Sequence, residues 1–183
     1  MSKTAIFMAD GVEEIEALTV VDLLRRAKEE IVMVNIHDTD KVVGSHNIVT
    51  ETDQKISEFN PADYDAVVLP GGLRGHQNLK ANDKVIAAVK EMAAAGKLVT
   101  AICAAPTVLG YAGVLEGKKA ICYPGMEDGL TGAVVTTEEV VCDGNIITSR
   151  GMGTAIPFGL AIIEYLQDKN AADEMASKIV FRQ

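Results

Sequence analysis

Residues 97–107 read Lys97-Leu98-Val99-Thr100-Ala101-Ile102-Cys103-Ala104-Ala105-Pro106-Thr107, an apolar run that leads directly into a cysteine. The β-branched and apolar residues 98–102 predict a buried strand. Small residues and Pro106 follow, and proline suits the first turn of a helix because its missing N–H would have no partner there. We therefore expect Cys103 at the corner between a strand and the N-terminal end of a helix.

This predicted corner gives Cys103 two interpretations. The dipole and the free N–H groups of a helix N-terminus favour a thiolate, which predicts a lowered pKa and a reactive thiol. The same geometry holds the serine of a nucleophile elbow, although the G-x-S-x-G pattern itself is absent. The alternative is a buried structural cysteine.

Strands and helices alternate on both sides of this corner. The pattern predicts strands over 4–8, 31–36, 66–69, 98–102 and 118–122, helices over 12–27, 83–95, 106–109, 153–166 and 171–180, and hairpins within 38–53 and 140–148. Such alternation predicts an α/β fold with a mostly parallel central sheet and helices on both faces. The length of 183 residues, without linker or internal repeat, predicts a single domain over residues 1–183.

Composition and charge exclude several classes of partner. A net charge of −9 argues against nucleic acid and anionic membranes, which bind clustered Lys and Arg. No apolar run approaches the ~20 residues of a membrane span, and the first residues do not form a signal peptide. The three cysteines, Cys103, Cys122 and Cys142, indicate neither a disulfide framework nor a metal site, so we expect a cytoplasmic protein without metal.

Three sequence features are expected at the carboxyl ends of strands, where ligands gather in parallel sheets: Asp10-Gly11, Pro70-Gly71-Gly72 and Cys103. A thiol, a glycine loop and a carboxylate together are what a nucleophilic site requires. Gly71-Gly72 either points N–H groups at a developing oxyanion or forms a plain tight turn. Glu16 is either a solvated charge or a site residue turned inward.

Other candidate residues have less specific interpretations. Glu13 and Glu14 are expected to complement the helix dipole, and Cys122 and Cys142 to lie in the core. Two histidines in polar loops, His46 and His76, are interpreted as either surface residues or rim of the site. The glycines at 151–153 lack the third glycine of a dinucleotide loop, and residues 113–118 miss the phosphate-loop spacing, so no cofactor is predicted.

Four motifs in order carry a family resemblance: Asp10-Gly11-Val12-Glu13-Glu14-Ile15-Glu16, Val67-Val68-Leu69-Pro70-Gly71-Gly72, Ala101-Ile102-Cys103-Ala104-Ala105-Pro106 and Thr148-Ser149-Arg150-Gly151-Met152-Gly153-Thr154. With them the chain resembles the ThiJ/PfpI superfamily, in its parkinsonism-associated deglycase branch, nearly end to end. The resemblance implies a flavodoxin-like sandwich, related to class I glutamine amidotransferase domains, and a homodimer. It also assigns site residues: the nucleophile Cys103, its acid partner Glu16, N–H donors Gly72 and Ala104, and rim residues Gly71, His46, Tyr123, Arg150, Gly151 and Met152.

The chain departs from the family pattern at its site. Tyr123 stands where that branch often has a histidine, His46 where it has an arginine reaching across the dimer, and Met152 where it has a proline. The protease-like branch places a histidine immediately after the cysteine, where this chain has Ala104. A proteolytic Cys-His pair is therefore not encoded.

Two classes of function agree with these residues, so the sequence leaves open whether the protein is an enzyme. In the first, the Cys103 thiolate attacks the aldehyde of a small dicarbonyl such as methylglyoxal, Glu16 shuttles protons, and water releases a hydroxy acid; a deglycase applies the same chemistry to an adduct. In the second, Cys103 is an oxidation sensor or chaperone-linked switch, with its sulfinate hydrogen-bonded by protonated Glu16.

Overall fold

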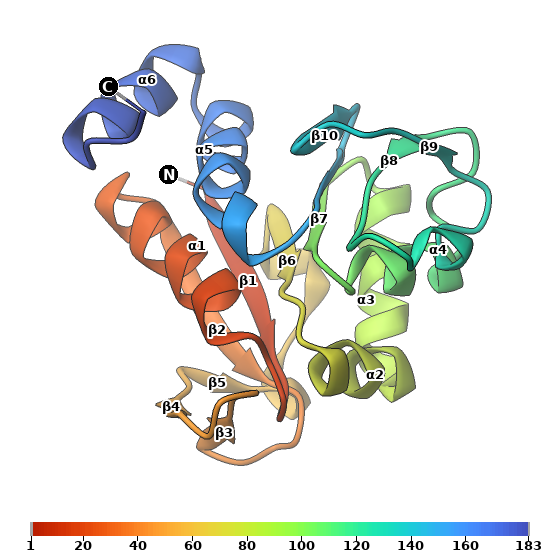
Figure 1. The fold of residues 1–183 in the computed structure, drawn as a ribbon. Coiled ribbons are helices and arrows are strands. Elements are labelled where there is room, and N and C mark those ends of the chain that lie inside the picture. The colour runs from red at the N-terminus through yellow and green to blue at the C-terminus, as the bar shows by residue number, and fades with distance from the viewer. Residues whose placement is uncertain (1, 183) are drawn as a thin grey trace.

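The computed structural model describes residues 2–182, in which a seven-stranded sheet carries helices on both faces (Figure 1). The strand order is β10-β11-β7-β6-β1-β2-β5, and every pair is parallel except β10 with β11. The strands span Lys3–Met8 (β1), Glu30–Asn35 (β2), Gln54–Lys55 (β5), Ala66–Leu69 (β6), Leu98–Ile102 (β7), Val140–Asp143 (β10) and Ile146–Ser149 (β11). The predicted flavodoxin-like α/β architecture is confirmed.

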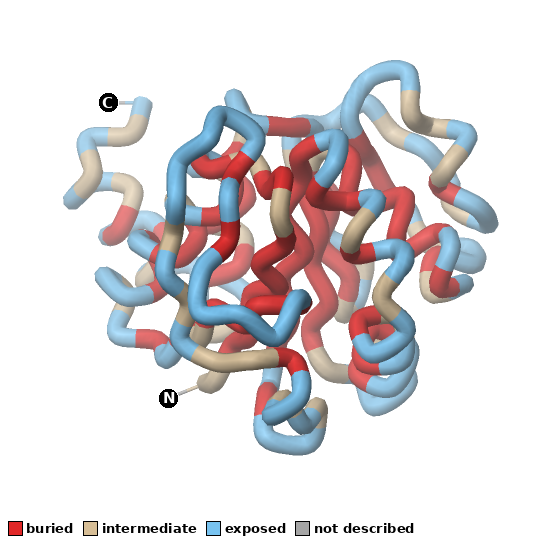
Figure 2. The backbone as a smooth tube through the Cα atoms, turned by 90° about the horizontal axis from the view of Figure 1, so that it is seen from below, coloured by how far each residue is buried: buried red, intermediate tan, exposed pale blue. Residues whose placement is uncertain are grey.

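The two faces of the sheet are covered by different sets of helices. Successive side chains of a strand point to opposite faces, so Ala5 and Phe7 of β1 join one core while Ile6 and Met8 join the other. The first core packs under α2 (Leu73–Ala81), α3 (Asp83–Ala94) and α4 (Pro106–Ala112), and the second under α1 (Glu14–Arg26), α5 (Ala155–Leu166) and α6 (Lys169–Lys178). Figure 2 shows the buried strands running between exposed outer segments.

Both predicted hairpins are present. One joins β3 (Lys41–Val43) to β4 (Val49–Glu51), and the other joins β10 to β11. The described residues also form four short 3-10 helices: Ile56–Glu58, Pro61–Asp63, Glu127–Gly129 and Met152–Thr154. In the described part of the chain, no helix is both long and apolar enough to cross a membrane.

The strand expected over 118–122 is present but shorter, and it lies outside the main sheet. Only Lys119–Ala120 (β8) is extended, and it pairs with Val134–Val135 (β9) in a separate two-stranded sheet. After Ala120, the Ile121 N–H donates to the side chain of Thr148 in β11, 3.0 Å away, instead of to the main chain of a neighbouring strand. This departure carries Tyr123 toward the end of β7.

Helix α2 is absent from the sequence prediction because its sequence has little apolar periodicity. Its buried residues are Gly75, His76 and Leu79. At Gly75 the helix contacts the β1–α1 loop through its backbone, because the Gly75 N–H donates to Gly11 O at 3.0 Å. A Cβ at position 75 would lie only 2.8 Å from the same oxygen. A glycine in the helix is therefore what allows α2 to approach the β1–α1 loop.

The two cysteines predicted for the core have different outcomes. Cys122 is buried, as expected, whereas Cys142 is exposed. Cys142 lies on the edge strand β10, whose alternation turns its neighbour Val141 into the core and Cys142 out. The core assignment of Cys142 is therefore wrong.

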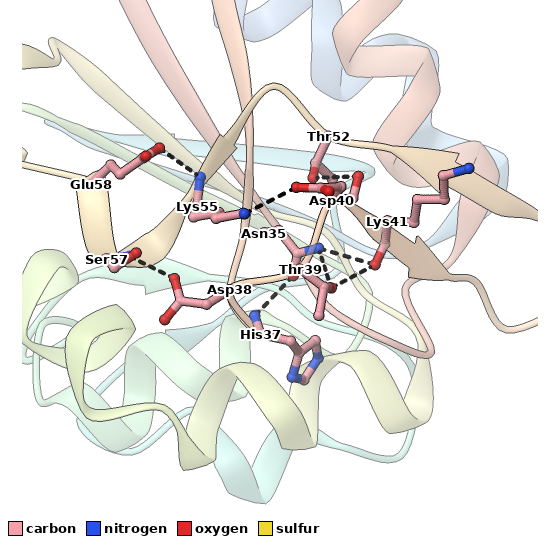
Figure 3. A network of polar contacts seen from close by, with 10 residues as sticks. All are labelled: Asn35, His37, Asp38, Thr39, Asp40, Lys41, Thr52, Lys55, Ser57 and Glu58. Atoms are coloured by element: carbon pink, nitrogen blue, oxygen red, sulfur yellow. Dashed lines mark hydrogen bonds and ion pairs between the residues drawn. The ribbon is translucent and has the colours of Figure 1, made fainter.

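A network of polar contacts anchors the β3–β4 hairpin to the end of β2 (Figure 3). The amide of the buried Asn35 donates to Thr39 Oγ1 at 3.0 Å and to Lys41 O at 3.1 Å, while Asp38 accepts from Ser57 N–H at 2.9 Å. At the far end of the hairpin, Ser45 N–H donates to Val12 O at 2.8 Å. Both ends of the hairpin are thus fixed, and its tip lies against the start of α1.

Candidate functional site

Cys103 directly follows β7 and has a backbone φ of +65°, in the left-handed region that non-glycine residues rarely adopt. Such a conformation costs on the order of 1–3 kcal/mol and persists only where its surroundings enforce it. Here the Cys103 N–H donates to Ser149 O at 3.0 Å, and its carbonyl accepts from Tyr123 N–H at 2.7 Å. The expected corner is present, and it is held from both sides.

Glu16 lies in the first turn of α1 and is turned inward, with an exposed fraction of 1%. Its Oε2 accepts a hydrogen bond from Gly71 N–H at 2.9 Å, and its carboxyl is hydrogen-bonded to the Cys103 thiol. Gly71 is required for this arrangement, because a Cβ at that position would overlap Glu16 Oε2 and lie 2.6 Å from Cys103 Cβ. The solvated alternative for Glu16 is thereby excluded.

The electrostatics of this pair differ from the sequence expectation. Burial, followed by the charge of Glu16, raises the pKa of the Cys103 thiol to about 12, although N–H groups act in the other direction. Burial likewise raises the pKa of Glu16 to about 7. The expected lowering of the Cys103 pKa is therefore wrong, because desolvation and an adjacent carboxylate outweigh the helix N-terminus. Glu16 is the neighbouring group that can take the thiol proton.

Two backbone N–H groups meet at the Cys103 sulfur. They belong to Gly72 and Ala104, the residues for which the family resemblance implied N–H donors, and both hydrogen-bond the sulfur. Gly72 has φ +95° and precedes α2, and a Cβ on it would overlap Gly11 O. The glycine loop is therefore more than a plain turn: it aims a donor at the thiol.

A cavity of about 540 Å³ opens over Cys103. Its lining residues are Glu13, Ser45, His46, Gly72, Leu73, Cys103, Ala104, Tyr123, Pro124 and Met126. Of the predicted rim, His46 and Tyr123 line it, and Gly151 lies beside it, since a Cβ there would be 3.5 Å from the Tyr123 ring and 4.0 Å from Cys103 Sγ. Arg150 and Met152 are exposed and do not line this cavity, so the structure does not bring them to the site.

Sequence reasoning missed the roles of two residues near the cavity. Glu14, expected to serve the helix dipole, is buried and accepts hydrogen bonds from the tip of the β3–β4 hairpin, including Ser45 Oγ at 3.0 Å. Glu13, expected to do the same, caps α1 by accepting from Glu16 N–H at 2.9 Å. Among three carboxylates so close in sequence, no local signal distinguishes these roles, because they depend on which loop packs against each one.

His76, the other loop histidine, is buried in α2, where its Nδ1 lies 3.2 Å from Gly72 O. It is absent from the lining of the Cys103 cavity. It therefore supports the loop that carries Gly72 instead of belonging to the rim.

Comparison with known proteins gives consistent matches. The profile of the DJ-1/PfpI family matches residues 2–165. Drosophila melanogaster dj-1beta is 37% identical over 183 residues, 98% of each chain, and a deglycase from Pyrococcus abyssi is 34% identical over 82% of this chain and 91% of its own. The chain spans only 36% of DJ-1 homolog B from Arabidopsis thaliana and 47% of homolog A. The solved structure of oxidised Toxoplasma gondii DJ-1 superposes with a TM-score of 0.96 at 34% identity, over 100% of both chains.

Proposed function

Because the chain belongs to the DJ-1/PfpI family, we propose that it is a cysteine-dependent enzyme acting on small reactive carbonyl compounds such as methylglyoxal. The observation that carries the proposal is the Cys103–Glu16 pair: a thiol hydrogen-bonded to a carboxyl group whose pKa is raised to about 7, with two N–H donors beside it. The relative from Pyrococcus abyssi named a deglycase supports the same class of substrate.

The proposed reaction begins when the Cys103 sulfur attacks the aldehyde carbon of methylglyoxal. The thiol proton passes to Glu16, which returns a proton to the alkoxide, and a hemithioacetal forms. A hydrogen then moves from C1 to C2 through an enediol, so that C1 reaches the oxidation level of a thioester while the C2 ketone becomes an alcohol. Water cleaves the thioester, releasing lactate and restoring the thiol.

The chain's own groups account for the charge that develops in this reaction. The Gly72 and Ala104 N–H groups already meet at the sulfur, so they lie where negative charge appears as the thiol loses its proton. The exposed Tyr123 ring and the hairpin tip define the opening through which a small carbonyl compound enters.

Lactate formation from methylglyoxal by the purified protein tests the proposal. We expect turnover in the wild type, none in Cys103→Ser, and wild-type turnover in the matched control Cys142→Ser, because Cys142 is exposed on the edge strand β10 and does not line the cavity. Equal activity of the two serine variants would refute a role for Cys103.

A second function is supported by the same environment. The two N–H donors and Glu16 surround the Cys103 sulfur and would hydrogen-bond the oxygens of a sulfinate, and a related structure, Toxoplasma gondii DJ-1, was solved in an oxidised state. Under this proposal Cys103 is an oxidation sensor. Mild peroxide would then add two oxygens to Cys103 in the wild type, and lactate formation would be negligible before oxidation.

A homodimer is also proposed, through one apolar groove. It is lined in part by four exposed hydrophobic residues from α1, the β3–β4 hairpin and α5: Ile15, Leu18, Ile48 and Ile156. Exposed apolar side chains gathered in this way are typical of a protein interface.

Two features of composition support the expected surroundings of the protein. Three free cysteines support a reducing compartment such as the cytoplasm, and the net charge of −9 supports the absence of nucleic acid partners.

A further inference from the structure

Glu14 is a buried carboxylate that serves the tip of the β3–β4 hairpin. It is 6% exposed, and it accepts from His46 N–H at 2.8 Å and from Ser45 Oγ at 3.0 Å, while His46 Nδ1 lies 3.1 Å from its Oε2. Burial acts to raise the pKa of Glu14, but these hydrogen bonds outweigh it and lower the pKa to about 2. Glu14 is therefore ionised at neutral pH and can only accept hydrogen bonds.

These contacts assign the hydrogen on the neutral His46 ring. Nδ1 faces the Glu14 carboxylate, which has no proton to donate, and the Ser45 hydroxyl, whose single hydrogen is donated to Glu14. Nδ1 must therefore carry the hydrogen, and Nε2 is left with a free lone pair. Across residues 2–182 no group is hydrogen-bonded to Nε2.

The position of His46 relative to the thiol is complementary to that of Glu16. His46 and Ser45 line the cavity over Cys103, and the His46 side chain is 73% exposed, so its ring is accessible to water. Glu16, at 1% exposed, lies on the buried side. The hairpin reaches Glu14 because position 44 is glycine: a Cβ there would overlap Glu14 Oε1.

We propose that His46 is the general base that activates water for hydrolysis of the Cys103 thioester, and that Glu14 is its positioning residue. Water oxygen attacks the thioester carbon while its proton passes to His46 Nε2; the C–S bond then breaks, and the sulfur leaves as a thiolate that regains a proton. A carboxylate that fixes the tautomer and orientation of a histidine is the arrangement known from catalytic triads. The inference rests on the proposed function, since only a reaction that acylates Cys103 requires this step.

The experiment separates deacylation from the carbonyl reaction by acylating Cys103 with p-nitrophenyl acetate. The burst of nitrophenolate reports acylation, and intact-protein mass reports how fast the acetyl group leaves. We expect His46→Gln to keep the burst and to slow deacetylation by ~10²-fold, in the range that general bases contribute. His37→Gln is the matched control, because His37 is exposed and hydrogen-bonded through Nε2 to Asp10 N–H but lies outside the cavity lining.

Glu14→Gln tests the positioning role with a spectroscopic readout. In ¹⁵N spectra of the wild type, the neutral His46 ring should have Nδ1 protonated and Nε2 free, and His46→Gln assigns the signals. Glu14→Gln should give a mixture of both tautomers and slower deacetylation, whereas a merely structural role would leave the tautomer unchanged. His46→Ala should regain deacetylation when free imidazole is added.

Several results would overturn the assignment of His46 as the general base. Wild-type deacetylation in His46→Gln, or an Nε2-protonated ring in the wild type, overturns it, as does the absence of a Cys103-dependent burst. Ligand-capable atoms of Glu13, Glu14 and His46 lie within 4.8 Å of one another, so loss of deacetylation after dialysis against EDTA would replace the base with a metal ion and also overturn it. Slowed deacetylation in His46→Gln without any lactate from methylglyoxal would refute methylglyoxal as a substrate, while His46 would still be the base that deacylates Cys103.

Discussion

The buried carboxyl group of Glu16 is hydrogen-bonded to the thiol of Cys103 across the space that Gly71 leaves free. Cys103 follows strand β7, and Glu16 lies in the first turn of helix α1. Helix α1 covers one face of the sheet, and α4, the helix after Cys103, covers the other. Because burial raises both pKa values, each group keeps its proton to a higher pH than it would in water, and the hydrogen bond is the direct path between the thiol and the carboxyl group.

The pH dependence of turnover follows from this pair. Glu16 must be ionised before it can accept the thiol proton, and its pKa is about 7. We therefore expect kcat/KM for methylglyoxal to rise as the pH increases through about 7. Glu16→Gln should lower kcat by ~10²- to 10⁴-fold and abolish this rise. An unchanged pH profile in Glu16→Gln would exclude Glu16 as the titrating group.

The same substitution, Glu16→Gln, should speed the alkylation of Cys103 although it lowers turnover. After burial, the charge of Glu16 is the largest cause of the raised Cys103 pKa, so Glu16→Gln should lower that pKa and speed the reaction with iodoacetamide at pH 8. The measurement uses a Cys142→Ser background, which removes the exposed thiol. Equal alkylation rates with and without the Glu16→Gln substitution would contradict the assigned cause.

Folding stability carries a second signature of Glu16. A folded pKa of about 7 lies above the ordinary value of 4.5, so the folded state binds more protons between these values and stability falls as the pH rises through this window. One pKa unit corresponds to about 1.4 kcal/mol. Between pH 4 and pH 8, the free energy of unfolding of Glu16→Gln should therefore rise on the order of 3 kcal/mol relative to that of the wild type.

Urea denaturation at the two pH values measures this difference, and Glu14 provides a control of opposite sign. Its pKa is lowered to about 2, so its contribution is present above pH 4.5 and is lost as the pH falls toward 2. Glu14→Gln should therefore destabilise the protein at neutral pH and approach wild type in acid. A pH-independent effect of both variants would contradict these pKa directions.

Gly71→Ala should separate Glu16 from Cys103. A Cβ at position 71 would overlap Glu16 Oε2 and lie 2.6 Å from Cys103 Cβ, so we expect a loss of about 1–3 kcal/mol and a large fall in turnover. Gly153→Ala is the matched control, because a Cβ at 153 meets nothing within 4 Å. Urea denaturation and lactate formation are measured on both. Similar losses in the two variants would show that steric conflict at Gly71 is not the cause.

The apolar groove along α1 predicts the oligomeric state. Ile48 is 53% exposed within it, and Ile48→Lys should convert a dimer of about twice the chain mass into a monomer, because a charge cannot be buried unpaired at an interface. Light scattering at micromolar concentration measures this. Tyr111→Ser is the control, since Tyr111 is 60% exposed on α4, away from the groove. A monomeric wild type would contradict the proposed homodimer.

The sheet and the nucleophile could be predicted from sequence because their signals are local. Residues 98–102 form a strand by their own composition, and the position of Cys103 follows from the strand that precedes it and the proline that follows. The alternation of strands and helices then fixes which loops meet at the carboxyl edge. These inferences depend on no side-chain contact between distant residues.

The roles of Glu14 and α2 could not be predicted, because they depend on tertiary packing. Glu14 differs from Glu13 in that Gly44 admits the hairpin tip to its carboxylate. The prediction of a lowered Cys103 pKa was wrong for a related reason. A helix N-terminus can be predicted from the sequence, whereas desolvation of the thiol by the surrounding chain cannot. Helix α2 packs against the β1–α1 loop through the backbone of Gly75, a contact that leaves no apolar pattern in the sequence.

The donors at the Cys103 sulfur are main-chain groups, and this has a consequence for how the protein can diverge. No point mutation removes a backbone N–H except replacement by proline, so Ala104 keeps its donor through most changes of side chain, whereas position 72 must stay glycine because a Cβ there would overlap Gly11 O. Tyr123, by contrast, is an exposed side chain on a loop and can be exchanged singly. Mutational drift can therefore alter what this site accepts while the groups that stabilise its sulfur are inherited unchanged.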